Sequence, residues 1–111
     1  MDLVILLFTF VMSGLVLAVV SVPLIFGWIP PNGLYGFRVR KTLKHPEIWY
    51  PVNAIGGKRL LLASLVEVLA SIALFFVPAL RIDTYAYAVL IVWVVAFAFA
   101  IVSMLRYINS L

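Results

Sequence analysis

The chain has 111 residues, of which 67% are hydrophobic and only 11% are charged, and its formal net charge is +4. Soluble domains are roughly half apolar and about a quarter charged, so this composition excludes an ordinary soluble fold and indicates an integral membrane protein. The sequence contains no cysteine, which excludes disulfides and thiolate metal sites.

Long apolar stretches are predicted to cross the bilayer as three helices, over about residues 3–26, 60–80 and 85–107. A helix needs roughly 20 mostly apolar residues to span a hydrocarbon core about 30 Å thick, and each stretch is long enough. Membrane strands are excluded because the runs are too long and do not alternate. We therefore expect an all-α membrane protein with three transmembrane helices and a structured loop over residues 30–59.

The first helix carries a stripe of small residues, namely Ser13, Gly14, Ala18 and Ser21. Small residues at this spacing let another helix backbone approach closely. Packing against the other two helices of the same chain is favoured over a dimer interface.

Basic residues are concentrated in the 30–59 loop, and Arg106 lies near the end of the third helix. Short loops rich in lysine and arginine stay in the cytoplasm. The expected location is the cell membrane, with several crossings, the loop and the C-terminus inside and the N-terminus outside. Because topology accounts for the positive charge, we expect no nucleic-acid partner.

The loop itself is expected to be ordered. Turn-forming residues at 30–33 end the first helix. From Pro46 the composition suits a short interfacial helix. Pro51 is expected to interrupt that helix, and Gly56 and Gly57 are expected to form a hinge before the second membrane helix.

Contact with anionic lipid is enough to explain most of the loop's basic residues. It does not explain the amides, aromatic residues and turn glycine that accompany them. A recognition surface with a defined shape for a ligand or partner would explain them, since binding residues often lie in loops positioned by a rigid scaffold. The candidate residues for binding a ligand or partner are Asn32, Tyr35, Gly36, Arg38, Trp49 and Asn53.

Glu67 lies well inside the second apolar stretch, with Ser64 and Ser71 on the same helical face. A carboxyl group at that depth is costly and should face the bundle interior or water. Two interpretations remain open. Glu67 is either a functional intramembrane polar site or a structural group that is protonated, or paired with a loop arginine such as Arg38.

No pattern in the sequence indicates catalysis. His45 is the single histidine, and a metal site needs more ligands than it offers. The segment 56–58 lacks the flanking residues of a phosphate-binding loop. We expect no catalytic residues, no metal and no cofactor.

The loop resembles the SdpI/YfhL family of small bacterial and archaeal membrane proteins, whose pattern is P-N-x-x-Y-G-x-R, T-L, W-x-x-x-N and a closing G-K/R. The matching residues, in the same order, are Pro31-Asn32, Tyr35-Gly36-Phe37-Arg38, Thr42-Leu43, Trp49-Tyr50, Asn53 and Gly57. The resemblance implies a single SdpI-like transmembrane module over residues 1–111. It further implies a role in immunity against a secreted killing peptide and in signalling its presence, with the matching loop residues in recognition.

Three functions are therefore carried forward. The first is recognition of a membrane-active peptide toxin or a membrane protein partner by the loop. The second is an oligomeric transporter or channel in which Glu67 lines a shared polar path, because one three-helix protomer is too thin to enclose a pore. The third is a small structural or accessory membrane subunit. The expected partners are the lipid bilayer, such a peptide or protein, and further copies of the chain.

Overall fold

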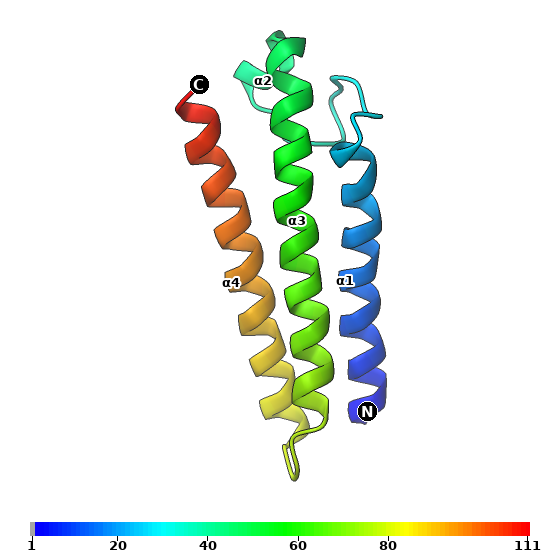
Figure 1. Ribbon diagram of the computed structural model, residues 1–111. Coiled ribbons are helices and arrows are strands. Elements are labelled where there is room, and N and C mark those ends of the chain that lie inside the picture. The colour runs from blue at the N-terminus through cyan, green and yellow to red at the C-terminus, as the bar shows by residue number, and fades with distance from the viewer. Residues whose placement is uncertain (1) are drawn as a thin grey trace.

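The computed structural model describes residues 2–111, which form four helices and no strand. These are α1 (Leu3–Ile25), α2 (Arg40–Lys44), α3 (Pro46–Phe75) and α4 (Ile82–Asn109). The three long helices run side by side, with α3 between α1 and α4 and with α2 at one end (Figure 1). The bundle measures 52 × 24 × 18 Å. Its long axis therefore exceeds the thickness of a bilayer, which is about 40–45 Å with its headgroups.

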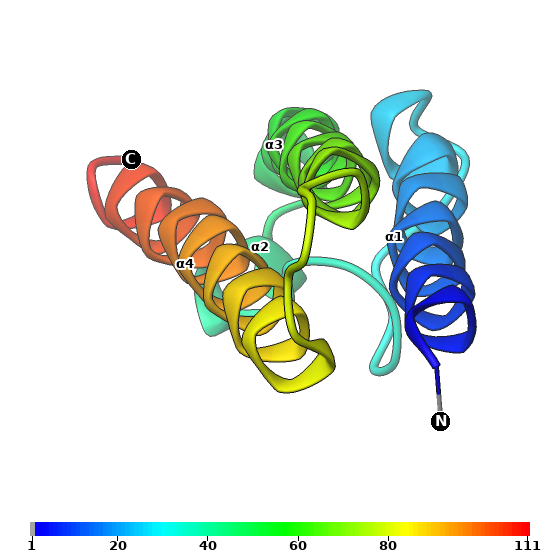
Figure 2. The same cartoon turned by 90° about the horizontal axis from the view of Figure 1, so that it is seen from below.

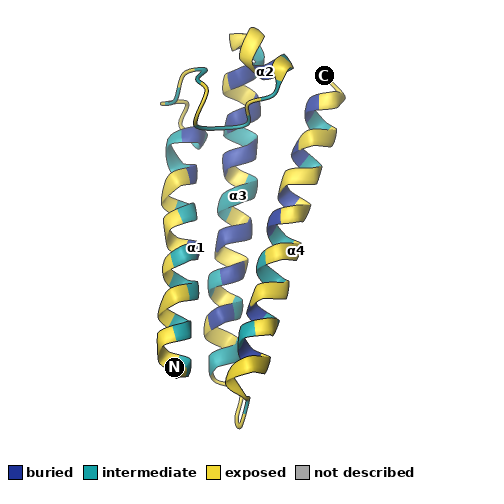
Figure 3. Cartoon of the chain, turned by 180° about the vertical axis from the view of Figure 1, so that it is seen from behind, coloured by how far each residue is buried: buried dark blue, intermediate teal, exposed yellow. Residues whose placement is uncertain are grey.

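Two of the helices, α1 and α4, are long and apolar enough to cross a membrane. Their outer faces expose large apolar side chains, including Val19 and Phe99, whose exposed fractions are 69% and 77%. Burial is concentrated along α3, while the outward faces of its neighbours are largely exposed (Figure 3). An all-helical chain with apolar faces turned outward fits lipid surroundings. The third predicted span, 60–80, covers the last part of α3 and most of the turn that follows it. Because α3 is not among these two helices, this crossing stays a prediction.

The loop is shorter than the predicted 30–59 segment, because α3 begins at Pro46 and continues without interruption to Phe75. The expected break at Pro51 and the expected hinge at the two glycines were wrong. Pro46 occupies the first turn, where its missing N–H leaves no helical hydrogen bond unmade. A short helix does precede α3, but it is α2, over Arg40–Lys44.

Gly56 and Gly57 serve close packing instead of bending. A Cβ at Gly56 would overlap the ring of Phe37, and one at Gly57 would lie 2.9 Å from the carbonyl oxygen of Ser21 in α1. Both positions are buried inside a regular helix. The missing side chains let the loop and α1 approach α3.

The small-residue stripe of α1 packs within the chain, as predicted. Gly14 and Ser21 are both buried on the α3 side of α1. A Cβ at Gly14 would overlap the carboxyl group of Glu67 and lie 2.5 Å from Cγ2 of Val68. The α1–α3 contact therefore depends on glycines from both helices.

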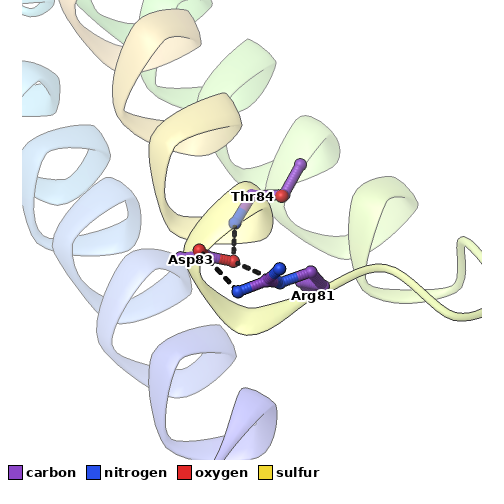
Figure 4. A network of polar contacts seen from close by, with 3 residues as sticks. All are labelled: Arg81, Asp83 and Thr84. Carbon is purple, nitrogen blue, oxygen red and sulfur yellow. Dashed lines mark hydrogen bonds and ion pairs between the residues drawn. The ribbon is translucent and has the colours of Figure 1, made fainter.

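The α3–α4 hairpin turns tightly through residues 76–81, and an ion pair lies at the start of α4. Arg81 Nε lies 3.3 Å from Asp83 Oδ1, and the same oxygen accepts the Thr84 N–H at 2.8 Å (Figure 4). Both charged side chains are exposed, so the pair contributes less than about 1 kcal/mol to stability.

Candidate functional site

The loop between α1 and α3 folds onto the first turns of α3, and we call residues 26–53 the loop head. Asn32 organises its first turn. Its Oδ1 accepts the N–H groups of Leu34 and Tyr35 at 2.8 and 2.7 Å, and its Nδ2 donates to the carbonyls of Pro30 and Tyr35 at 2.8 and 3.0 Å. An asparagine that bonds the backbone on both sides fixes a turn. The structure therefore places this candidate residue within the loop framework.

Trp49 and Asn53, one turn apart on α3, hold the loop against the helix. Trp49 is fully buried, and its indole N–H donates to the Ile29 carbonyl at 2.8 Å. Asn53 accepts the Phe37 N–H at 2.6 Å and donates to the Trp49 carbonyl at 3.0 Å. Gly36 passes over this pair with a φ of +111°, and a Cβ there would lie 2.7 Å from Asn53 Oδ1. A side chain would be strained and obstructed at that point.

Tyr35 and Arg38 extend the framework in two directions. The Tyr35 hydroxyl donates to the Val20 carbonyl of α1, and burial raises the pKa of this phenol. Arg38 donates one N–H to the Gly33 carbonyl, and its side chain is exposed. A guanidinium carries five N–H donors, so Arg38 has further donors directed to its surroundings.

Two residues that were not candidates also hold the loop head, Thr42 by bonds within it and Lys41 by a bond to α4. The Thr42 hydroxyl is fully buried and donates to the Phe37 carbonyl at 2.7 Å while it accepts the Val39 N–H at 3.0 Å. Lys41 Nζ reaches the Ile108 carbonyl of α4 at 3.3 Å. Seen along the bundle, the chain passes from α1 to the α4 side at this end (Figure 2). The position of Thr42 in the T-L part of the pattern was the available signal, whereas nothing marked Lys41 as more than a topology charge.

The loop head presents a mixed apolar and basic surface, which we call the loop-head surface. Leu34 is 92% exposed and Trp28 is 64% exposed. The loop head also exposes the basic residues Arg38, Arg40 and Lys44. Aromatic and basic side chains in this combination are typical of the level of lipid headgroups.

The second candidate site lies deeper, between α3 and α1. Glu67 is fully buried, and its Oε1 accepts the Ser71 hydroxyl at 3.2 Å. Its Oε2, which lies against Gly14, has no hydrogen-bond partner. The Tyr85 hydroxyl of α4 donates to the Ser71 carbonyl at 2.9 Å. Ser64 shares the buried face but donates to its own helix, at the Leu60 carbonyl.

The two candidate sites are separate. Within residues 2–111 the close contacts between basic and acidic side chains are His45–Glu47 and Arg81–Asp83, so Glu67 and Arg38 do not meet. A buried carboxylate without a counter-charge is costly. Within the described residues, no loop arginine therefore pairs with Glu67, and Ser71 supplies its side-chain hydrogen bond.

A comparison with protein-family models matches residues 28–106 to the SdpI/YfhL protein family. The matched segment includes every candidate residue of the loop and also extends through α3 and most of α4. The comparisons with curated proteins and with solved structures returned no match.

Proposed function

Because the chain belongs to the SdpI/YfhL protein family, we propose that it is a cell-membrane protein that recognises a membrane-active peptide. It is not an enzyme in this proposal. The loop-head surface makes the contact, and binding protects the cell or signals the presence of the peptide, as the family resemblance implies.

The observation that carries this proposal is that some residues of the loop head hold its fold while others face outward. Hydrogen bonds hold the loop in shape and against α3, and they are made by Asn32, Trp49 and Asn53. The absence of a side chain at Gly36 allows the loop to lie close to α3. The outward residues, above all Arg38, are thereby held in one arrangement before any partner arrives. A preorganised surface loses less conformational entropy on binding than a flexible loop.

The chemistry of the surface defines the peptide class. Arg38 suits a carboxylate, with which a guanidinium forms charge-assisted hydrogen bonds. Leu34 and Trp28 suit the apolar side of an amphipathic helix at the headgroup level. The proposed ligand is an amphipathic peptide that carries a carboxylate near this surface.

The proposed topology places the loop head in the cytoplasm. In it, α1, α3 from residue 60 onward, and α4 cross the membrane. Support comes from the charge difference between the two ends of the bundle. The loop-head end carries most of the basic residues and Arg106, whereas the opposite end has Arg81 beside Asp83.

Survival of cells challenged with a panel of amphipathic peptides tests the proposal. Cells that express the chain should survive at higher peptide concentrations than cells that do not, and Arg38→Gln should remove most of that advantage. The matched control is Arg81→Gln, which removes the same charge from the opposite end. Equal survival with and without the chain, together with no binding of these peptides to the purified protein, would contradict the proposal.

The unpartnered Oε2 of Glu67 supports a second candidate, in which protomers assemble into a transporter or channel. In this alternative Glu67 lines a polar path, and Glu67→Gln should reduce flux across proteoliposomes. The packing of Glu67 against Gly14 inside one protomer makes it the weaker candidate, because the carboxyl group faces α1 and not a neighbouring copy. A strictly monomeric chain in lipid would exclude it.

A further inference from the structure

A groove lies between α3 and α4 and has a volume of about 740 Å³. Its walls are apolar along most of their length, with Leu62 and Val66 on α3 and Val95 and Phe99 on α4. Leu62, Val95 and Phe99 are more than half exposed, so the groove is open along its side. An open apolar groove in a membrane protein is accessible to lipid acyl chains.

The end of the groove nearest the loop head is positively charged. Arg59 lies there and donates to the Ser103 hydroxyl at 3.0 Å, with its guanidinium carbon 5.9 Å from the centre of the Tyr107 ring. A second hollow adjoins this end and is lined by Arg59, Arg106 and Tyr107 among others. No carboxylate lines either hollow, and the ion pairs of the described residues involve neither arginine. Within the described residues, no acidic side chain therefore balances the two arginines at this end of the groove.

We propose that this groove binds an anionic phospholipid. The headgroup phosphate lies between Arg59 and Arg106, and one acyl chain lies along the apolar walls. Arginine forms strong, charge-assisted hydrogen bonds with phosphate, and basic pockets between membrane helices bind anionic headgroups. This site is distinct from the loop-head surface, so either proposal can fail while the other stands.

The length of the groove matches a lipid better than a partner helix. Its lining on α4 extends from Ile91 to Ser103, and the twelve steps of helix rise between these residues correspond to about 18 Å. One leaflet contributes about 15 Å of the roughly 30 Å hydrocarbon core, whereas a spanning helix must cross both leaflets. An occupant with a charged head at one end and an apolar tail of one leaflet's depth is a phospholipid.

Native mass spectrometry of the purified full chain tests the proposal with two lipids of identical acyl chains, phosphatidylglycerol and phosphatidylcholine. Phosphatidylglycerol should remain bound at lower concentration. Arg59→Gln and Arg106→Gln should each weaken its retention about fivefold, as expected for one arginine near an anionic lipid surface. Arg81→Gln, at the opposite end of the bundle, should leave retention unchanged.

The acyl-chain part is tested separately by filling the groove. Val95→Trp should reduce retention of phosphatidylglycerol, while Val94→Trp should not, because Val94 is similarly exposed on α4 but does not line the groove. Val95→Trp leaves both arginines in place, so it remains informative if Arg59→Gln fails to fold.

Three results would overturn the proposal. Equal retention of the two lipids would remove the role of the arginines. Equal effects of the two tryptophan variants would remove the role of the groove. Inorganic phosphate that binds as tightly as phosphatidylglycerol would show that the acyl chain contributes nothing.

Discussion

At the scale of single residues, the loop head is held by a small number of polar side chains that bond the backbone. Asn53 is the central one, because it joins Phe37 of the loop to Trp49 of its own helix. The Asn53 side chain is buried, so water competes little for its amide group. Loss of this side chain leaves the part-buried Phe37 N–H without its acceptor, which is more costly than the loss of a fully exposed hydrogen bond.

Asn53→Ala should therefore loosen the loop and destabilise the fold by about 1–3 kcal/mol. The measurement is amide hydrogen exchange of the purified protein, in which the Phe37 amide should lose protection. Asn109→Ala, at an exposed asparagine in the last turn of α4, is the control and should change nothing in the loop. Unchanged protection at Phe37 in Asn53→Ala would show that the hydrogen bond does not hold the loop.

At the scale of elements, the long helix α3 organises the bundle because both α1 and α4 pack against it. Its helical character could be predicted only in part. The apolar stretch from residue 60 onward indicated a helix, but Pro51, Gly56 and Gly57 indicated an interrupted one. The glycines have a different cause, which is the approach of Phe37 and Ser21 from distant parts of the chain. Contacts of that kind are absent from local sequence patterns.

The two explanations of Gly57 predict opposite signs for Gly57→Ala. If Gly57 only bends the helix, replacing it with alanine should raise the free energy of unfolding by about 1 kcal/mol, because alanine favours a helix. If Gly57 is instead required for packing, the replacement should lower the free energy of unfolding. The new Cβ would lie 2.9 Å from the Ser21 carbonyl oxygen, so the backbone of α1 must move. We expect the loss, of about 1–3 kcal/mol.

Unfolding of Gly57→Ala and the unchanged chain by denaturant in the same detergent gives the sign directly. Gly33→Ala is the matched control, because a Cβ at Gly33 meets no atom within 4 Å. A more stable Gly57→Ala would restore the interpretation as a hinge.

At the scale of the whole molecule, the class of protein and the position of the candidate site could be predicted, and the arrangement within the site could not. Composition alone indicated an all-helical membrane protein, and the loop pattern indicated the family that the comparison shows. The short helix α2 was not predicted, because its five residues carry no apolar periodicity. Its position depends on a bond from Thr42 to the nearby Phe37 carbonyl and on one from Lys41 to the distant Ile108 carbonyl. The surroundings of Glu67 could not be predicted either. Its separation from Arg38 is set by how the helices pack in the bundle and not by the spacing of the two residues in the sequence.

The topology of the whole chain gives a last prediction, since the third crossing depends on α3. Leu34 precedes α3 and Thr84 follows it, and both residues are exposed. If α3 crosses the bilayer, these two positions lie on opposite sides, with Leu34 inside and Thr84 outside. The chain has no cysteine, so Leu34→Cys and Thr84→Cys each introduce a single thiol. On intact cells a membrane-impermeant maleimide should label the Thr84→Cys thiol at once and the Leu34→Cys thiol only after the membrane is opened. Labelling of both thiols from the same side would mean that α3 does not cross. The reverse order would keep the crossing but place the loop-head surface, with its basic residues, outside the cell.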